Sequence, residues 1–561
     1  MSNESTLQMS LAFDDPTQAA VELKPVENKE ISTRKKAGGK EPRKRVSAEA
    51  LATKQRDISV SEFFSKNRHL LGFDNPAKAL LTTVKEAVDN SLDACEEAGI
   101  LPDVVVEVIE LGADRYRVSV QDNGPGIVKA EVPKIFGKLL YGSKFHTLKQ
   151  SRGQQGIGIS AAGMFGLITT GKPMVITTRT SPRHPAYYYE LRIDTAKNKP
   201  EILTDTEVEW GAEHGTRVEI EIAASYRRGQ HSVDTYLEQT AVANPHASLW
   251  YTLPGQEEVS LLRTSGELPP EPREMRPHPH GVELGMLMKL LREQKGRGKG
   301  LRGTLVEDFS RVTSRVADEI CEKAGLPPET RPHLLSPEQI ERLHKAISEV
   351  KIMAPPSDCV VPIGEELIRK GLERKYKADF FTSSTRPPTV YRGNPFVIEV
   401  GIAYGGDLPG DEPAEIMRFA NRVPLQYQKS ACSITEAVME TNWKSYGIQQ
   451  SKGGPPVGPL AVLIHVASAW VPFTSESKEA IAHYPEIIRE MKLGLQECGR
   501  RLGLFLSHRR READAMKKLS YIEKYIPHIG EALKEILKLS EKDKDKMIDT
   551  LTLMLERSRS V

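Results

Sequence analysis

One stretch, Lys85 to Ala94, constrains the fold of this chain more than any other. Apolar residues recur around it at the three- and four-residue steps of one buried helical face. They are Leu81, Val84, Val88 and Leu92. Glu86 and Asn90 stand four residues apart, so this helix presents both side chains on the same side. A carboxylate and a carboxamide held together suit the activation of a water molecule and the coordination of Mg²⁺.

The next motif is an alternating, β-rich run from Val118 to Asp122, which leads into a polar turn. Asp122 would end the strand, where its carboxylate suits a hydrogen bond from an exocyclic amine such as that of adenine. Gly124 and Gly126 in the turn permit backbone conformations and a close approach to a ligand that a Cβ would block. By itself, however, D-x-G-x-G is usually no more than a turn.

The third motif is the glycine-rich segment from Arg152 to Ser160, which runs into a small-residue helix predicted at residues 161–164. Loop amides followed by a helix N-terminus form a cradle for phosphates. The segment has neither the G-K-[ST] of a P-loop nor a convincing dinucleotide fingerprint. All three motifs occur in this order between Glu86 and Ile159, and together they resemble the N, G1 and G2 boxes of the GHKL ATPases, a superfamily that includes gyrase B, Hsp90, histidine kinases and MutL.

Composition limits the domain number, the binding surfaces and the cellular location that this chain can have. The chain has 561 residues, 39% of them hydrophobic and 27% charged, which predicts a soluble protein of two to four domains. A net charge of only +2 means that any nucleic-acid surface is local. Five cysteines without C-x-x-C spacing favour reduced thiols over a disulfide framework or a zinc site. Because no apolar run is long enough for a membrane span and the N-terminus lacks a signal pattern, an intracellular protein without membrane partners is expected.

The succession of expected helices, strands and linkers along the chain predicts an α/β multidomain protein with five segments. These are a disordered basic tail (1–56), an α/β ATPase domain (57–272), a helical insert (273–353), a second α/β domain (354–515) and a C-terminal helical tail (516–561). Strands are expected at 173–178, 216–222, 395–402 and 460–466. A long helical stretch is expected from Ser477, with a break near Pro527. Residues 276–280, rich in His and Pro, are interpreted as linker rather than metal site.

Four longer sequence segments refine the resemblance from a superfamily to one family. They are Gly142 to His146, Gln150 to Gly158, Thr385 to Phe396 and Asn442 to Tyr446. These segments resemble the B subunit of topoisomerase VI, the type IIB DNA topoisomerase, over roughly residues 57 to 515. The resemblance implies a GHKL (Bergerat) α/β sandwich, then a helix-two-turn-helix insert, then an α/β transducer domain with a long C-terminal helix. The further C-terminal domain of some relatives is not expected.

The resemblance also implies roles for individual residues. Glu86 matches the general base that polarises water, Asn90 the Mg²⁺ ligand and Asp122 the residue that binds adenine. The triphosphate of ATP would be wrapped by Arg152, Gly153, Gln154, Gln155, Gly156, Ile157, Gly158 and Ile159, with Ser143 and Lys144 contributing from the preceding lid. Lys452 matches the catalytic transducer lysine that reaches the γ-phosphate, although a lysine in a loop is usually only solvated. Asp89, before Asn90, stands where Glu is expected in many relatives.

DNA contact is predicted from three basic or aromatic segments, each of which also has an ordinary structural explanation. Lys295 to Lys299, with Arg302, forms a basic loop suited to phosphates or simply to solvent. Trp443 to Tyr446 matches a family motif, but such aromatics are more often packing residues. The run from Arg500 to Arg511 suits contact with either double-stranded DNA or another protein chain of the complex.

No segment offers the nucleophilic tyrosine and acidic Mg²⁺-binding module that DNA cleavage requires, and the D-x-D at Asp543 is interpreted as a solvated turn. The resemblance therefore implies a partner, the tyrosine-bearing A subunit of the topoisomerase, in an A₂B₂ heterotetramer. ATP binding would dimerise two B chains, with an exchanged arm near residues 58–64, and the partner would cleave and pass DNA. The alternatives are a GHKL scaffold or a mismatch-repair-type ATPase. A histidine kinase is disfavoured because the tail before Ile58 lacks a histidine.

Overall fold

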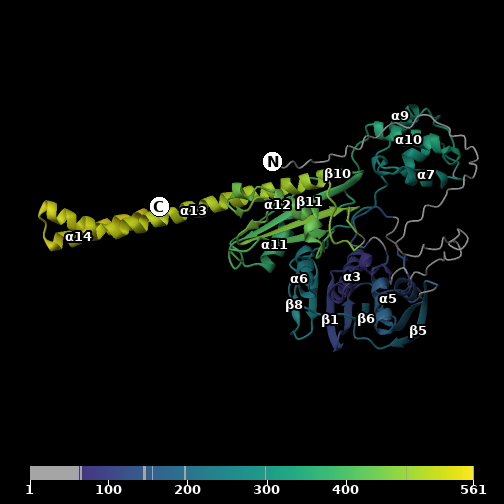
Figure 1. Ribbon diagram of the computed structural model, residues 1–561, viewed down its shortest axis with the longest axis horizontal. Coiled ribbons are helices and arrows are strands. Elements are labelled where there is room, and N and C mark those ends of the chain that lie inside the picture. Colours follow the sequence, from purple (N-terminus) through teal and green to yellow (C-terminus); the bar gives the residue numbers. More distant parts are fainter. Residues whose placement is uncertain are drawn as a thin grey trace, which may run out of the picture. The chain divides into compact units, whose positions relative to one another are not determined.

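The computed structural model describes residues 62, 66–142, 147–153, 156–194, 197–296, 298–475 and 477–559. The predicted basic tail lies outside these residues, as does the exchanged arm near residues 58–64 apart from Glu62. The remaining chain contains two large sheets, one in the N-terminal half and one in the C-terminal half (Figure 1).

The first sheet has eight strands in the order β5-β4-β3-β6-β2-β1-β7-β8. Its strands are β1 (Asp103–Gly112), β2 (Arg115–Asp122), β3 (Met174–Arg179), β4 (Ala186–Asp194), β5 (Lys199–Val208), β6 (Gly215–Ala223), β7 (Ser248–Thr252) and β8 (Val259–Leu261). Only β1 and β7 pair in parallel; the other neighbours are antiparallel. The strands expected at 173–178 and 216–222 are therefore confirmed as β3 and β6.

The helices of this part are η1 (Arg68–Leu71), α3 (Pro76–Glu97), α4 (Val132–Gly137), α5 (Gly158–Thr170) and α6 (Val233–Ala243). The predicted helix at Lys85 is confirmed as part of α3, which begins where the Asn75 side chain accepts a hydrogen bond from the Lys78 amide at 2.8 Å. The apolar face of α3 packs against β2, and α5 packs against β6 (Figure 1). The polar edge of α3 is thereby fixed relative to the end of β2.

A separate hydrophobic core holds the helical segment together. Its elements are η3 (Pro279–Gly281), α7 (Leu284–Arg292), α8 (Leu301–Asp308), α9 (Ser314–Ala324), η4 (Pro332–Leu334) and α10 (Pro337–Glu349). The helical texture predicted for this segment is confirmed. Ser336 and Gln339 form a capping box at the start of α10, which satisfies two amides that the helix itself leaves free.

The second sheet has the order β10-β11-β16-β12-β13, and β9 also pairs with β11. Its elements are α11 (Glu365–Lys375), β9 (Phe380–Thr385), β10 (Thr389–Tyr391), β11 (Asn394–Tyr404), β12 (Glu415–Ala420), β13 (Val423–Pro424), η5 (Lys429–Ala431), α12 (Ser433–Glu440), η6 (Trp443–Tyr446) and β16 (Leu460–Ser468). A small hairpin of β14 (Gln449–Gln450) and β15 (Pro456–Val457) precedes β16. The strands predicted at 395–402 and 460–466 are confirmed as β11 and β16.

The C-terminal helices differ from the prediction in three places. Helix α13 (Pro485–Leu537) begins eight residues after Ser477 and continues through Pro527, so the predicted break there is wrong. The helix ends instead at Lys538, which adopts a left-handed conformation, and α14 (Glu541–Arg559) folds back against α13. The loss of one hydrogen bond at a proline is tolerated where such packing supports the helix. Asp543 is exposed to solvent as predicted, but it lies in the first turn of α14 rather than in a connecting turn.

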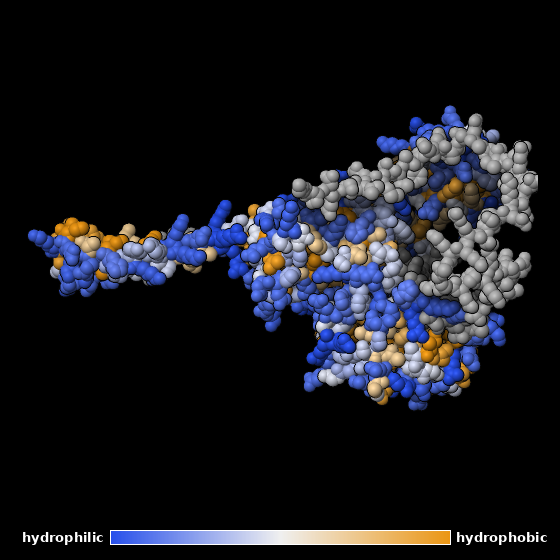
Figure 2. All heavy atoms as spheres, in the orientation of Figure 1, coloured by the Kyte–Doolittle hydropathy of each residue, from blue (hydrophilic) through white to orange (hydrophobic). Residues whose placement is uncertain are grey.

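Apolar side chains remain exposed along the α13–α14 pair, as the orange spheres in Figure 2 show. Among them are Met516, Tyr521, Ile522, Tyr525 and Ile536. Within the described residues, no helix combines the length and the apolar character needed to cross a bilayer.

Candidate functional site

A cavity of about 640 Å³ lies between α3 and the glycine-rich segment before α5. Its walls come from regions that are distant in the sequence: helix α3 and the residues just before it, the turn and loops that follow β2, strand β6, and two segments of the second sheet domain. The last two are Pro424, Gln426 and Tyr427, and residues 477–479. The cavity is therefore built by both sheet domains.

Glu86 and Asn90 both line this cavity, one turn apart on α3, as the sequence predicts. The structure brings Glu86 against Gly158, where a Cβ on residue 158 would overlap the Glu86 carboxylate. A larger residue at 158 would therefore displace the Glu86 carboxylate from this position. Asn90 is exposed, so its amide oxygen is available to a ligand. Mg²⁺ is typically held by one or two protein oxygens together with phosphates and water, so these residues fit the implied ion.

Asp122 ends β2 and lines the cavity, also as predicted. Its carboxylate accepts hydrogen bonds from Ser91 Oγ at 3.0 Å, from the Gly124 amide at 2.9 Å and from the Thr216 amide at 3.1 Å. Burial nevertheless raises the pKa of this carboxyl above its ordinary value. These contacts hold the carboxylate in one orientation, which suits recognition of a flat base with an exocyclic amine.

Behind the Glu86 turn, Asp89 is buried and accepts a hydrogen bond from the Tyr236 hydroxyl at 2.9 Å. Burial raises the pKa of Asp89 to about 6, against the opposing attraction of Lys85 and Arg152. Asp89 therefore supports α3 from the protein side and does not line the cavity.

The glycine-rich segment borders the cavity through Gly153 and residues 156–159, and α5 begins at Gly158. Gly156 has a φ of 56°, a left-handed conformation that favours glycine. The N-terminus of α5 thus borders the cavity, an arrangement that suits a bound anion. The predicted contacts of Ser143, Lys144, Gln154 and Gln155 lie outside the described residues.

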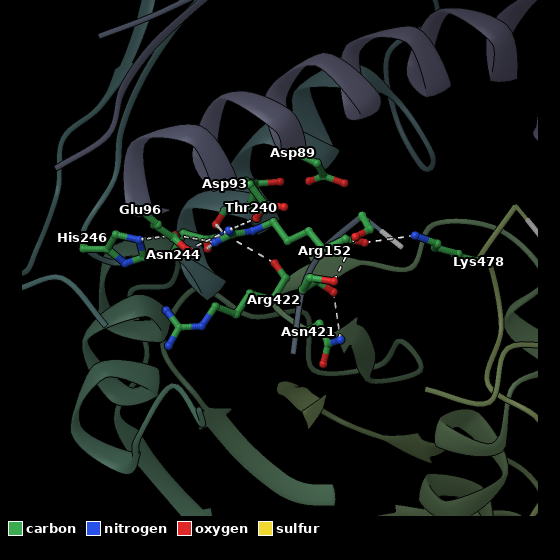
Figure 3. A network of polar contacts seen from close by, with 12 residues as sticks. Asp89, Asp93, Glu96, Arg152, Thr240, Asn244, His246, Asn421, Arg422 and Lys478 are labelled. Atoms are coloured by element: carbon green, nitrogen blue, oxygen red, sulfur yellow. Dashed lines mark hydrogen bonds and ion pairs between the residues drawn. The ribbon is translucent and has the colours of Figure 1, made fainter. Parts of the chain in front are cut away.

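Arg152 is placed differently from the prediction. Its side chain does not line the cavity. The guanidinium is buried and forms ion pairs with Asp93 at 2.7 Å and Glu96 at 2.6 Å on the inner side of α3 (Figure 3). These carboxylates raise the pKa of Arg152 despite the opposing effect of burial. A direct contact between this guanidinium and phosphate is not supported by the arrangement, because the buried Asp93 and the partly buried Glu96 already pair with it.

Lys452 is also placed away from the cavity: it is exposed in the connection between β14 and β15. The transducer lysine that does line the cavity is Lys478, which sequence reasoning missed. Its ammonium donates a hydrogen bond to the Arg152 carbonyl at 3.0 Å. Burial lowers the pKa of Lys478, while Glu86 acts in the opposite direction. The sequence signal that could have separated Lys478 from the helix is Pro485, because proline favours the first helical turn.

The two aromatic residues predicted to contact DNA, Trp443 and Tyr446, pack within the protein. Trp443 is fully buried, and its indole N–H donates to the Val438 carbonyl at 2.8 Å. Tyr446 packs against Gly499 of α13. These residues join η6 to the long helix, which agrees with the packing interpretation.

Several predicted basic residues are already paired. Arg509 contacts Asp379 at 2.6 Å, Arg501 contacts Glu497 at 2.7 Å, and Arg302 contacts Asp318 at 3.2 Å. All three are exposed or partly exposed, so these pairs are weak and leave the surface available to phosphates.

The histidines of residues 276–280 form hydrogen bonds with backbone carbonyls. His278 lies 3.0 Å from the Met353 carbonyl oxygen, and His280 lies 3.0 Å from that of Val350. No group of three or more His, Cys, Asp or Glu side chains suited to a metal ion occurs in the described part of the chain. The interpretation of residues 276–280 as linker holds only in part, because Pro279–Gly281 form η3, which packs against α10.

Comparison with known proteins adds family information to this geometry. Residues 75–225 match the model of the histidine kinase-, DNA gyrase B- and HSP90-like ATPases, and residues 355–518 match that of the topoisomerase VI B subunit transducer.

Three similar proteins are named as the B subunit of type 2 DNA topoisomerase 6. The protein of Methanococcoides burtonii is 52% identical over 491 residues, covering 87% of this chain and 79% of the relative. That of Methanosarcina mazei is 51% identical, covering 88% and 79%. That of Archaeoglobus fulgidus is 44% identical, covering 91% and 84%. With the ATPase and transducer regions both matched, the chain belongs to the family of type 2 DNA topoisomerase 6 B subunits, the ATPase subunits of these enzymes.

Proposed function

We propose that this chain binds ATP with Mg²⁺ in the cavity beside α3 and uses hydrolysis to time DNA passage by a second protein. The observation that carries this proposal is the meeting of Glu86 and Lys478 at one cavity, because they come from the two sheet domains. Any change at the γ-phosphate would then act on both domains.

In the proposed reaction, Glu86 accepts the proton of the water that attacks the γ-phosphate. Asn90 would hold Mg²⁺, which neutralises phosphate charge when bound. Asp122 would accept a hydrogen bond from the adenine amine. Loop amides from Gly153 to Ile159 would bind the phosphates.

Lys478, rather than Lys452, is proposed as the cation that meets the γ-phosphate. Its position on the cavity wall beside Glu86 supports this assignment. Lys452 has no comparable position, since it is exposed in the loop before β15. A positive charge at the γ-phosphate stabilises the charge that develops in phosphoryl transfer.

The partners in this proposal are double-stranded DNA, a second copy of the chain and a topoisomerase A subunit, in an A₂B₂ heterotetramer. The exposed apolar residues of α13 and α14 support docking of the A subunit at this end of the chain. ATP-driven dimerisation of two B chains would close around DNA, and transducer movement would separate the A subunits. A function on genomic DNA implies a cytoplasmic, nucleoid-associated location, which stays a prediction.

The test mixes the purified chain and the co-encoded, tyrosine-bearing A subunit with supercoiled DNA in one assay and with catenated DNA circles in a second. ATP-dependent relaxation and decatenation are expected, and Glu86→Ala should abolish both while nucleotide still binds. Hydrolysis without relaxation would favour the alternative of a GHKL or mismatch-repair-type ATPase without topoisomerase activity. Binding without hydrolysis would favour a scaffold.

A further inference from the structure

A buried cluster of charges fixes Arg152 to α3. Arg152 Nη1 donates to Asp93 at 2.7 Å and to Glu96 at 2.8 Å, and Nη2 donates to Glu96 at 2.6 Å (Figure 3). Glu96 also lies 2.6 Å from His246 Nε2. Burial opposes the charge on Glu96, but Arg152 and His246 outweigh it and hold the pKa of this carboxyl below its usual range. The two Nη groups of the guanidinium, which form its planar fork of donors, are therefore fixed in orientation.

The same residue is tied to the second sheet domain. Asn244, fully buried, accepts a hydrogen bond from Arg152 Nη2 and donates from Nδ2 to the Arg422 carbonyl at 3.3 Å. Arg422 in turn donates its amide to His465 Nε2 at 2.9 Å on β16. A continuous line of buried polar contacts thus leads from α3 to the centre of the transducer sheet.

The backbone next to Arg152 is tied to the transducer as well. The Ser151 carbonyl accepts from Asn421 Nδ2 at 3.0 Å, and the Arg152 carbonyl accepts from Lys478 Nζ at 3.0 Å. One residue earlier, the Gln150 side chain accepts from the Val361 amide at 2.7 Å. Three consecutive residues before Gly153 therefore contact three separate transducer segments.

We propose that Arg152 is a positioning residue: its buried ion pairs hold the carbonyls of residues 151 and 152 as fixed acceptors for Asn421 and Lys478. Helix α3, residues 151 and 152 and the transducer segments that they contact then move together. This inference rests on the proposed function, because the movement in question is the response of the loop to a bound triphosphate.

The energetic reason is the burial of the cluster. If residues 151 and 152 moved alone, the buried Asp93 and the partly buried Glu96 would lose their cation, and unpaired charges of this kind are strongly destabilising. If α3 and the contacted transducer segments move with them, the ion pairs on α3 and the hydrogen bonds to Asn421 and Lys478 all survive. The cluster therefore disfavours independent motion of the loop.

The experiment measures hydrogen exchange in the full-length chain, with and without a saturating non-hydrolysable ATP analogue. Arg152→Lys keeps the charge but removes the fork. Asn421→Gly removes the donor to Ser151 and suits the left-handed φ of 47° at this position. The matched control is Lys375→Met, which cuts another contact between the two domains, Lys375 to Glu238 at 2.8 Å, away from the loop.

In the unsubstituted chain and in Lys375→Met, the analogue should slow exchange about tenfold in both residues 156–160 and residues 359–364. In Arg152→Lys and Asn421→Gly, only residues 156–160 should respond. Melting curves identify a variant that fails to fold, and the other variant then carries the test. The proposal is overturned if residues 359–364 still respond to the analogue in both Arg152→Lys and Asn421→Gly. It is also overturned if residues 359–364 no longer respond in the control, Lys375→Met. An unsubstituted chain that binds no analogue would instead overturn the proposed function, and this inference with it.

Discussion

The ammonium of Lys478 lies 3.0 Å from the backbone carbonyl of Arg152, although 326 positions separate the two residues in the chain. This contact joins the segment before α13 to the first residue of the glycine-rich segment. It brings a transducer cation to the wall of a cavity whose other groups, Glu86 and Asn90, lie on α3.

Lys478→Gln should lower kcat for ATP hydrolysis by about 10²-fold, because it removes the positive charge beside Glu86. Lys452→Gln is the matched variant, since Lys452 is exposed and away from the cavity, and its kcat should stay within about twofold of the unsubstituted chain. Steady-state phosphate release measures both. Equal losses in the two variants, or a loss in Lys452→Gln alone, would contradict the assignment.

Glu86→Gln should reduce kcat by about 10²–10⁴-fold while leaving the affinity for a non-hydrolysable ATP analogue nearly unchanged. The amide has almost the same shape as the carboxylate but does not accept a proton. Calorimetric titration gives the affinity and phosphate release gives kcat. A variant that hydrolyses ATP at the normal rate would show that another group acts as the base.

Gly158→Ala should impair hydrolysis because its Cβ would overlap the Glu86 carboxylate and displace it. Gly285→Ala is the control: residue 285 lies in α7, where an added Cβ meets no atom within 4 Å. Only the first variant should lose activity, and the melting temperature of each reports on folding. Full activity of a folded Gly158→Ala protein would mean that the carboxylate is free to shift without loss of function.

Asp89 should make stability depend on pH. Its folded pKa of about 6 lies above the ordinary value of 3.8, so the folded chain binds the proton more tightly than the unfolded chain. Stability contributed by the protonated carboxyl is present below pH 4 and is lost as pH rises towards 6, by about 3 kcal/mol in total.

Asp89→Asn removes this titration and can still accept the hydrogen bond from Tyr236. Its melting temperature should exceed that of the unsubstituted chain at pH 7.5, and the difference should shrink as the pH is lowered to 4. Melting curves at several pH values provide the measurement. A difference that is independent of pH would show that Asp89 does not titrate in this range.

Local pattern was sufficient for several parts of this protein. The apolar spacing around Lys85 predicted α3, and with it the shared face of Glu86 and Asn90, because a helix fixes the positions of residues four apart. Alternation predicted β2 and placed Asp122 at its end. The glycine spacing predicted the loop before α5. Each of these features depends on residues within a few positions of one another.

Local pattern failed where distant packing decides the outcome. The predicted break at Pro527 did not occur, since α14 packs against the end of α13, and the helix ends at Lys538 instead. Arg152 was expected to face phosphates because it opens a glycine loop. Its direction is set by Asp93 and Glu96, which lie almost sixty positions earlier on α3.

The sequence by itself therefore determined the family, the α3 pair and the glycine loop, since periodicity and short motifs express them directly. Only the tertiary structure decided which lysine reaches the cavity and which way Arg152 points. The physical reason is that a cation goes where buried or partly buried carboxylates and carbonyls compensate its charge. For Lys478 this group is the Arg152 carbonyl of the other sheet domain, and for Arg152 the groups are the Asp93 and Glu96 carboxylates of α3.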